Sequence, residues 1–149
     1  MKIKLAKTEI IHFIGIGGIG MSGLAIIMKN MGFKVQGSDI SLNKNIERLK
    51  KNQIKVSIGH KKNNILNSTI IVYSSAIKMS NPEILEAKRK KLPIYKRGKM
   101  LGEIVSLMKN IVVAGSHGKT TTTSLISSIF LSASIDCTTI NGGVLNSFK

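Results

Sequence analysis

Residues 9–20 read EIIHFIGIGGIG, a β-branched run that ends in a glycine-rich turn. A run of this kind, stopped by Gly15, predicts a buried strand over residues 9–14. From residue 19 onward apolar side chains recur at helical spacing, and Gly32 supplies a stop signal. The stretch therefore predicts a strand, a tight glycine turn and a helix in direct succession.

Strand and helix patterns keep alternating after this first helix. The helix with the clearest start follows Asn81-Pro82-Glu83, which supplies a capping residue, a proline at the first helical position and an acid in the first turn. Further strands are predicted over residues 33–37, 54–58, 69–73 and 93–95, and helices around residues 46–49, 81–90 and 100–108. Alternation of this kind predicts an α/β fold, a Rossmann-like parallel sheet covered by helices on both faces.

The pattern restarts near Lys109. Residues 111–114 (IVVA) predict a new strand that enters a second glycine turn, followed by a helix and a last strand near residues 138–140. We expect a first domain over residues 1–108 and the start of a P-loop ATP-binding domain over residues 109–149. The second part is too short to support a core of its own. It is expected to be incomplete, either because the chain is a fragment of a longer protein, which we favour, or because the gene is truncated.

The composition is that of an ordinary globular protein. Hydrophobic residues make up 42% and charged residues 20%, and Cys137 is the single cysteine. An intramolecular disulfide and a cysteine-rich metal site are therefore excluded. No apolar run is long enough to cross a membrane, and the N-terminus leads into a strand and not into a cleavable leader, so we expect a cytoplasmic protein without membrane insertion.

The net charge of +16 raises the possibility of a nucleic-acid partner. The 23 basic residues are scattered along the chain, however, and aromatic residues are only 4% of it. Basic clusters without interleaved aromatic side chains offer no stacking platform for bases. We therefore expect solvated lysine-rich faces and no specific nucleic acid, with a basic nucleic-acid-binding module as an alternative.

The first glycine turn, residues 15–20, has the form G-x-G-x-x-G between a strand and a helix. Gly15 permits the tight turn, Gly17 lets a diphosphate approach the backbone, and the helix N-terminus offers N–H donors. An anionic ligand is predicted. Asp39 lies 19 residues beyond Gly20, where it either contacts that ligand or caps a turn. An NAD(P)-dependent oxidoreductase is the alternative that this motif favours.

The second glycine turn, GSHGKTT at residues 115–121, is the second half of a P-loop. The first glycine of the full pattern is absent, since Val113 stands there. The remaining half still has backbone N–H groups to surround a phosphate, Lys119 to reach terminal phosphates and the Thr120 hydroxyl to bind Mg²⁺. His117 either contacts a ligand with its ring or acts only through its backbone.

Both turns and several shorter motifs resemble the Mur ligase family, over nearly the whole chain. The motifs are IHFIGIGGIGMSGLA at residues 11–25, GSDI at 37–40, SSAI at 74–77, NPEI at 81–84, ML at 100–101, AGSHGKTTTT at 114–123 and NGG at 141–143. Ser116 departs from the threonine usual in the family but keeps the hydroxyl. Lys99 stands where the family usually has an acid.

The resemblance implies ATP-dependent ligation of L-alanine to UDP-N-acetylmuramate through an acyl phosphate, a step of peptidoglycan precursor synthesis. It implies that the first domain binds the UDP substrate through Gly15, Gly17, Gly18, Gly20, Ser38, Asp39, Ser74 and Ser75. It also implies that ATP is bound by Gly115, Ser116, His117, Gly118, Lys119, Thr120 and Thr121, with Lys119 and Thr120 catalytic and Thr120 on Mg²⁺. In the family a second Mg²⁺ acid and the residues that orient the amine lie further along the chain than residue 149.

Overall fold

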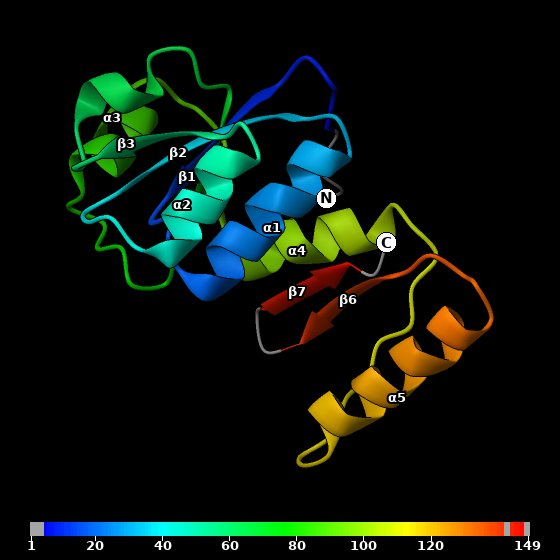
Figure 1. Cartoon of the computed structure of the whole chain (residues 1–149). Helices are drawn as coiled ribbons and strands as arrows, with labels where there is room; N and C mark the ends of the chain where they lie inside the picture. The colour runs from blue at the N-terminus through cyan, green and yellow to red at the C-terminus, as the bar shows by residue number, and fades with distance from the viewer. Residues whose placement is uncertain (1–4, 142–143, 148–149) are drawn as a thin grey trace. The chain divides into compact units, whose positions relative to one another are not determined.

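The structure is a computed structural model that describes residues 5–141 and 144–147. The chain divides into two compact units, residues 1–108 and 109–149. Each unit is a separate arrangement of helices and strands (Figure 1), and each is described by itself.

The first unit is built on a five-stranded sheet with the strand order β3-β2-β1-β4-β5. All four neighbouring strand pairs are parallel. The strands are β1 (Ile10–Ile14), β2 (Lys34–Asp39), β3 (Lys55–Ile58), β4 (Ile70–Tyr73) and β5 (Ile94–Lys96). The predicted Rossmann-like parallel sheet is therefore confirmed, and β1, the strand that leads into the first glycine turn, lies at its centre.

Helices cover both faces of this sheet (Figure 1). The elements are α1 (Ile19–Asn30), α2 (Lys44–Lys51), the 3₁₀ helix η1 (Lys62–Ile65), α3 (Pro82–Arg89) and α4 (Arg97–Ser106). Helix α1 contacts both α2 and α4, whereas α3 packs with η1. The predicted start of α3 is confirmed, because Pro82 is its first residue and the Asn81 side chain accepts a hydrogen bond from the Glu83 N–H at 2.9 Å.

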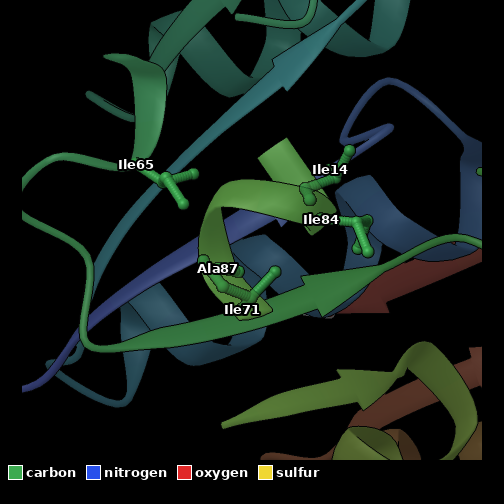
Figure 2. Close-up of a cluster of buried hydrophobic side chains, with 5 residues drawn as sticks. All are labelled: Ile14, Ile65, Ile71, Ile84 and Ala87. Atoms are coloured by element: carbon green, nitrogen blue, oxygen red, sulfur yellow. The ribbon is translucent and has the colours of Figure 1, made fainter. Parts of the chain in front are cut away.

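The core on the α3 side forms because alternate residues of a strand face opposite sides of the sheet. Ile14 of β1 and Ile71 of β4 pack against Ile84 and Ala87 of α3 and against Ile65 of η1 (Figure 2). All five side chains are fully buried. The sequence pattern did not predict η1, whose four residues carry the buried Ile65.

The second unit consists of α5 (Lys119–Ser132) and an antiparallel hairpin of β6 (Thr138–Asn141) and β7 (Val144–Ser147). The strand predicted over residues 111–114 is not formed. A strand needs a neighbour to receive its backbone hydrogen bonds, and in the described part of the chain β6 pairs with β7 alone. Residues 111 and 112 are consequently exposed, at 62% and 75%.

A second correction concerns the end of α4. The helix predicted around residues 100–108 ends at Ser106, so Leu107 and Met108 lie beyond it and both side chains are exposed. Within residues 5–141 and 144–147, no helix is long and apolar enough to cross a membrane.

Candidate functional site

The first glycine turn lies at the topological switch point of the sheet. From β1 the chain continues to β2 and β3 on one side, and later to β4 and β5 on the other. In open parallel sheets, ligands bind at the carboxyl ends of the strands where the strand order reverses. The loops that follow β1 and β4 meet there, since a Cβ placed on Gly15 would lie 3.2 Å from the Ser74 Cβ.

The backbone of the turn is held by β2. Gly15 has a φ of +78°, a conformation that glycine adopts readily and L side chains rarely do. The N–H groups of Gly15 and Ile16 both donate to the main-chain carbonyl of Ser38, at 2.9 and 3.0 Å. The turn is therefore fixed to the end of the neighbouring strand.

The Asp39 carboxylate forms hydrogen bonds with the backbone around the turn. One of its carboxylate oxygens accepts the Gly17 N–H at 2.7 Å, and the other accepts the Ile40 N–H at 2.8 Å. The Asn45 side chain completes the arrangement by donating to the Gly17 carbonyl at 2.7 Å. Of the two roles left open for Asp39, this geometry favours the turn-capping one.

The N-terminus of α1 lies within the first glycine turn. Gly18 is the capping residue, so no side chain caps the helix, and its first turn contains no acidic residue. Uncapped N–H groups at the positive end of a helix dipole favour an anion. Gly18 itself is exposed.

Arg97, which the sequence analysis did not select, lies beside this helix end. It is the first residue of α4, directly after β5, and a Cβ placed on Gly20 would lie 2.9 Å from one guanidinium nitrogen. The side chain is half-buried, and within the described residues it has no hydrogen bond or ion pair. The sequence could have indicated Arg97 by its position directly after a predicted strand. Residues that follow parallel strands lie at the same edge of the sheet, where the first glycine turn also lies.

The three serines predicted to bind the UDP substrate lie in different surroundings. Ser74 is half-buried beside Gly15 and Ser75 is exposed. Ser38 is fully buried, and its hydroxyl donates to Glu83 at 2.6 Å. Donating to a ligand would require this hydroxyl to break its hydrogen bond with Glu83. Of Ser38, we therefore keep in the site only the main-chain carbonyl, which accepts the N–H groups of Gly15 and Ile16.

Beneath the turn lies a buried polar cluster around Glu83, to which the sequence analysis gave no role. Besides Ser38, the Glu83 carboxylate accepts hydrogen bonds from the His12 Nε2 at 3.2 Å and from the Asn64 side chain, and His60 Nδ1 lies 3.6 Å away. Burial raises the pKa of Glu83, but the hydrogen bonds from His12, Ser38 and Asn64 outweigh it and hold the pKa below its usual value. Glu83 is therefore an ionised carboxylate near neutral pH.

The second glycine turn, residues 115–121, leads directly into α5. Gly118 caps α5 with a left-handed φ of +76°, and no side chain caps the helix. The Lys119 ammonium folds back over the loop and donates to the carbonyls of Gly115 and Ser116, at 2.6 and 3.0 Å. His117, Thr120 and Thr121 are exposed. The loop thus presents backbone N–H groups, an ammonium and a hydroxyl together, which fits a nucleoside triphosphate with Mg²⁺.

A model of the Mur ligase family, described as its catalytic domain, matches residues 10–109 of the 149. The chain belongs to the Mur ligase family. The predicted resemblance is thereby confirmed, and the matched stretch contains the first turn and ends before the second.

Individual relatives agree with membership of the Mur ligase family. The chain is 72% identical to UDP-N-acetylmuramate–L-alanine ligase of Pelagibacter ubique over 149 residues, which are 100% of the chain and 32% of that protein. It is 55% identical to the ligase of the same name from Aquifex aeolicus over 134 residues, 90% of the chain and 30% of that protein. The chain spans about a third of the length of these relatives.

Solved structures of Mur ligases have the same fold. UDP-N-acetylmuramate-alanine ligase from Thermotoga maritima superposes with a TM-score of 0.80 at 31% identity, over 89% of this chain and 31% of that one. A murein peptide ligase from Psychrobacter arcticus gives a TM-score of 0.80 at 28% identity, over 87% of this chain and 28% of that one.

Proposed function

We propose that the chain is part of a ligase that joins L-alanine to UDP-N-acetylmuramate with ATP, a step of peptidoglycan precursor synthesis. The observation that carries the proposal is the 72% identity with the Pelagibacter ubique ligase over the whole chain, both glycine turns included. The two turns lie in separate units, which suits two different phosphate-bearing ligands.

The first turn is proposed to bind the diphosphate of the UDP substrate. Its support is the uncapped N-terminus of α1, the glycines that let the backbone come close, and the Arg97 guanidinium, which has no partner among the residues that the structure describes. Ser74, which lies beside Gly15 on the loop after β4, and Ser75, which follows it, are proposed as further contacts. Asp39 contributes by holding Gly17.

The second turn is proposed to bind ATP and Mg²⁺. Backbone N–H groups of residues 115–119 would surround a phosphate, the Lys119 ammonium would neutralise charge on the terminal phosphates, and the Thr120 hydroxyl would be a Mg²⁺ ligand. Mg²⁺ would supply charge neutralisation between the phosphates. Among the described residues no group of three or more His, Cys, Asp or Glu side chains could hold a metal ion, so Thr120 is the one ligand that we assign.

The proposed reaction has two steps. In the first, a carboxylate oxygen of the UDP substrate attacks the γ-phosphorus of ATP, the bond to ADP breaks and an acyl phosphate forms. In the second, the amine of L-alanine attacks the acyl carbon, loses a proton and expels inorganic phosphate, leaving an amide. Lys119 serves the first step by stabilising charge on the phosphoryl group in transfer. The direct test is phosphate release by the full-length protein, which should require both UDP-N-acetylmuramate and L-alanine.

An NAD(P)-dependent oxidoreductase fits the first unit less well. That function would use the acid at the end of β2 to hold a ribose, whereas both oxygens of Asp39 accept backbone N–H groups. It would also leave the second turn without a role.

Replacing Arg97 by alanine is expected to weaken binding of UDP-N-acetylmuramate about tenfold, because a charge-assisted hydrogen bond to phosphate contributes roughly 1.5 kcal/mol or more. Lys99→Ala is the matched control: it removes the same charge two positions away, where the exposed ammonium lies 5.3 Å from the Tyr95 ring centroid. Calorimetric titration of both variants measures the difference. Equal affinities for the two variants would remove Arg97 from the site.

A further inference from the structure

Glu83 and the polar side chains around it form a buried cluster that is linked to the first turn through Ser38. The proposed function assigns no role to the Glu83 carboxylate. Glu83 is fully buried in the first turn of α3. A buried charge is costly unless it is fully hydrogen-bonded. This carboxylate receives four donors from three segments of the first unit: His12 of β1, Ser38 of β2, and the η1 segment with the N–H of its cap Lys61 and the side chain of Asn64.

Ser38 connects this carboxylate to the turn. Its hydroxyl donates to Glu83 at 2.6 Å, while its main-chain carbonyl receives the N–H groups of Gly15 and Ile16. One residue therefore joins the buried charge to the two peptide groups that shape the start of the glycine turn. Any shift of Ser38 on losing Glu83 is passed directly to those two peptides.

His12 makes a second connection, through the strand that leads into the turn. The Gln36 amide nitrogen donates to the Asn64 carbonyl and to Ser68 at 3.1 Å each, and it lies 3.4 Å from the His12 Nδ1. The other ring nitrogen of His12, Nε2, donates to the ionised Glu83 carboxylate at 3.2 Å. The same carboxylate restrains both β1 and β2, the two strands between which the turn is held.

From this geometry we infer that Glu83 is a positioning residue for the substrate turn: its carboxylate fixes Ser38 and His12, and through them the geometry in which Gly15 and Ile16 present the turn to a diphosphate. The inference rests on the proposed function of the turn for its biological meaning. The coupling between Glu83 and the turn is a property of the free chain and can be measured without ligand.

The first test is amide hydrogen exchange by NMR on the 149-residue chain. Glu83→Gln is expected to speed exchange of the Gly15 and Ile16 amides at least about tenfold, because Ser38 loses its charged acceptor. Glu86→Gln is the matched control on the same helix, since that side chain pairs at 2.7 Å with the exposed Arg89 and does not face the turn. It should leave both amides unchanged.

If the Glu83→Gln variant does not fold, the Ser38→Ala variant tests the same connection between Glu83 and the turn. It removes only the hydroxyl, leaves the other donors of Glu83 in place, and should speed exchange of the same two amides by a smaller factor. Unchanged exchange of both amides, or equal acceleration across all strands of the sheet, would overturn the inference, since the second result describes general destabilisation.

Affinity separates this inference from the proposed function. Glu83→Gln should also weaken UDP-N-acetylmuramate binding about tenfold, and in the full-length protein it should raise the KM for that substrate while leaving the KM for ATP unchanged. If the unaltered chain binds no UDP substrate but the exchange result holds, the proposed function fails and the positioning role stands. If the chain binds and the exchange is unaltered, the positioning role fails.

A pH profile gives an independent readout. The pKa of Glu83 is lower in the folded chain than in the unfolded one, so the stability it contributes is full above the unfolded value of about 4.3 and is lost as pH falls through the folded value. The other titratable side chains that face it are His12 and His60. The free energy of unfolding should therefore fall less steeply below about pH 4.3 in Glu83→Gln than in the unaltered chain or Glu86→Gln; identical slopes would contradict a buried, ionised Glu83.

Discussion

Lys119→Ala in the full-length protein is expected to abolish phosphate release that depends on L-alanine, with a loss of about 10² to 10³ in rate or more. The Lys119 ammonium already lies over the loop carbonyls of Gly115 and Ser116, where the phosphates of ATP would bind. Removing it deletes charge stabilisation of the phosphoryl group in transfer. The measurement is steady-state phosphate release with UDP-N-acetylmuramate, ATP and L-alanine.

Two comparisons make the result for Lys119 specific. Lys109→Ala removes the same charge from an exposed side chain ahead of the loop and should leave turnover near normal. In Lys119→Ala itself, the affinity for UDP-N-acetylmuramate should change by less than about twofold, because that substrate is assigned to the other turn. Near-normal turnover, or a collapse of UDP-substrate affinity, would show that the two turns have been assigned to the wrong ligands.

Gly17→Ala is expected to lower the affinity for UDP-N-acetylmuramate by about two orders of magnitude. The added Cβ would lie 2.7 Å from the Asn43 Nδ2 and 2.9 Å from an Asp39 carboxylate oxygen, so either these side chains or the turn must shift, and the hydrogen bond by which Asp39 holds the Gly17 N–H is disturbed. Overpacking of this kind also costs about 1 to 3 kcal/mol of stability. Calorimetric titration, run well below the unfolding temperature of the variant, measures the affinity.

The control for Gly17 is another glycine of the same unit. Gly102→Ala places a Cβ where nothing lies within 4 Å, in the middle of α4, and should leave affinity unchanged with equal or slightly higher stability. If Gly17→Ala bound the UDP substrate as well as Gly102→Ala does, the close approach of a diphosphate to the turn would be refuted.

Local patterns were sufficient to predict much of the first unit. The run from β1 through the glycine turn to α1, and the cap formed by Asn81 and Pro82, are determined by residues that are neighbours in sequence. The strand predicted over residues 111–114 fails for the opposite reason. Its formation depends on hydrogen bonds to another strand, and the described residues provide none beside it.

The parts of the site that sequence analysis did not predict depend on contacts between distant segments. Glu83 has the sequence position of an ordinary first-turn acid, and its burial results from packing α3 against β1, β4 and η1. The proximity of Arg97 to Gly20 likewise follows from the strand order, which brings the residue after β5 to the same edge as the turn after β1. For Asp39 the sequence left open a ligand contact and a turn cap, and its backbone partners could be identified only from the structure.

Isothermal titration calorimetry of the 149-residue chain with UDP-N-acetylmuramate and with NAD tests the central claim, that the first turn binds a nucleotide-sugar diphosphate. The account predicts weak but measurable binding of UDP-N-acetylmuramate, lost in Gly17→Ala, and no binding of NAD. Binding of NAD that equals or exceeds that of UDP-N-acetylmuramate would contradict it and favour the oxidoreductase.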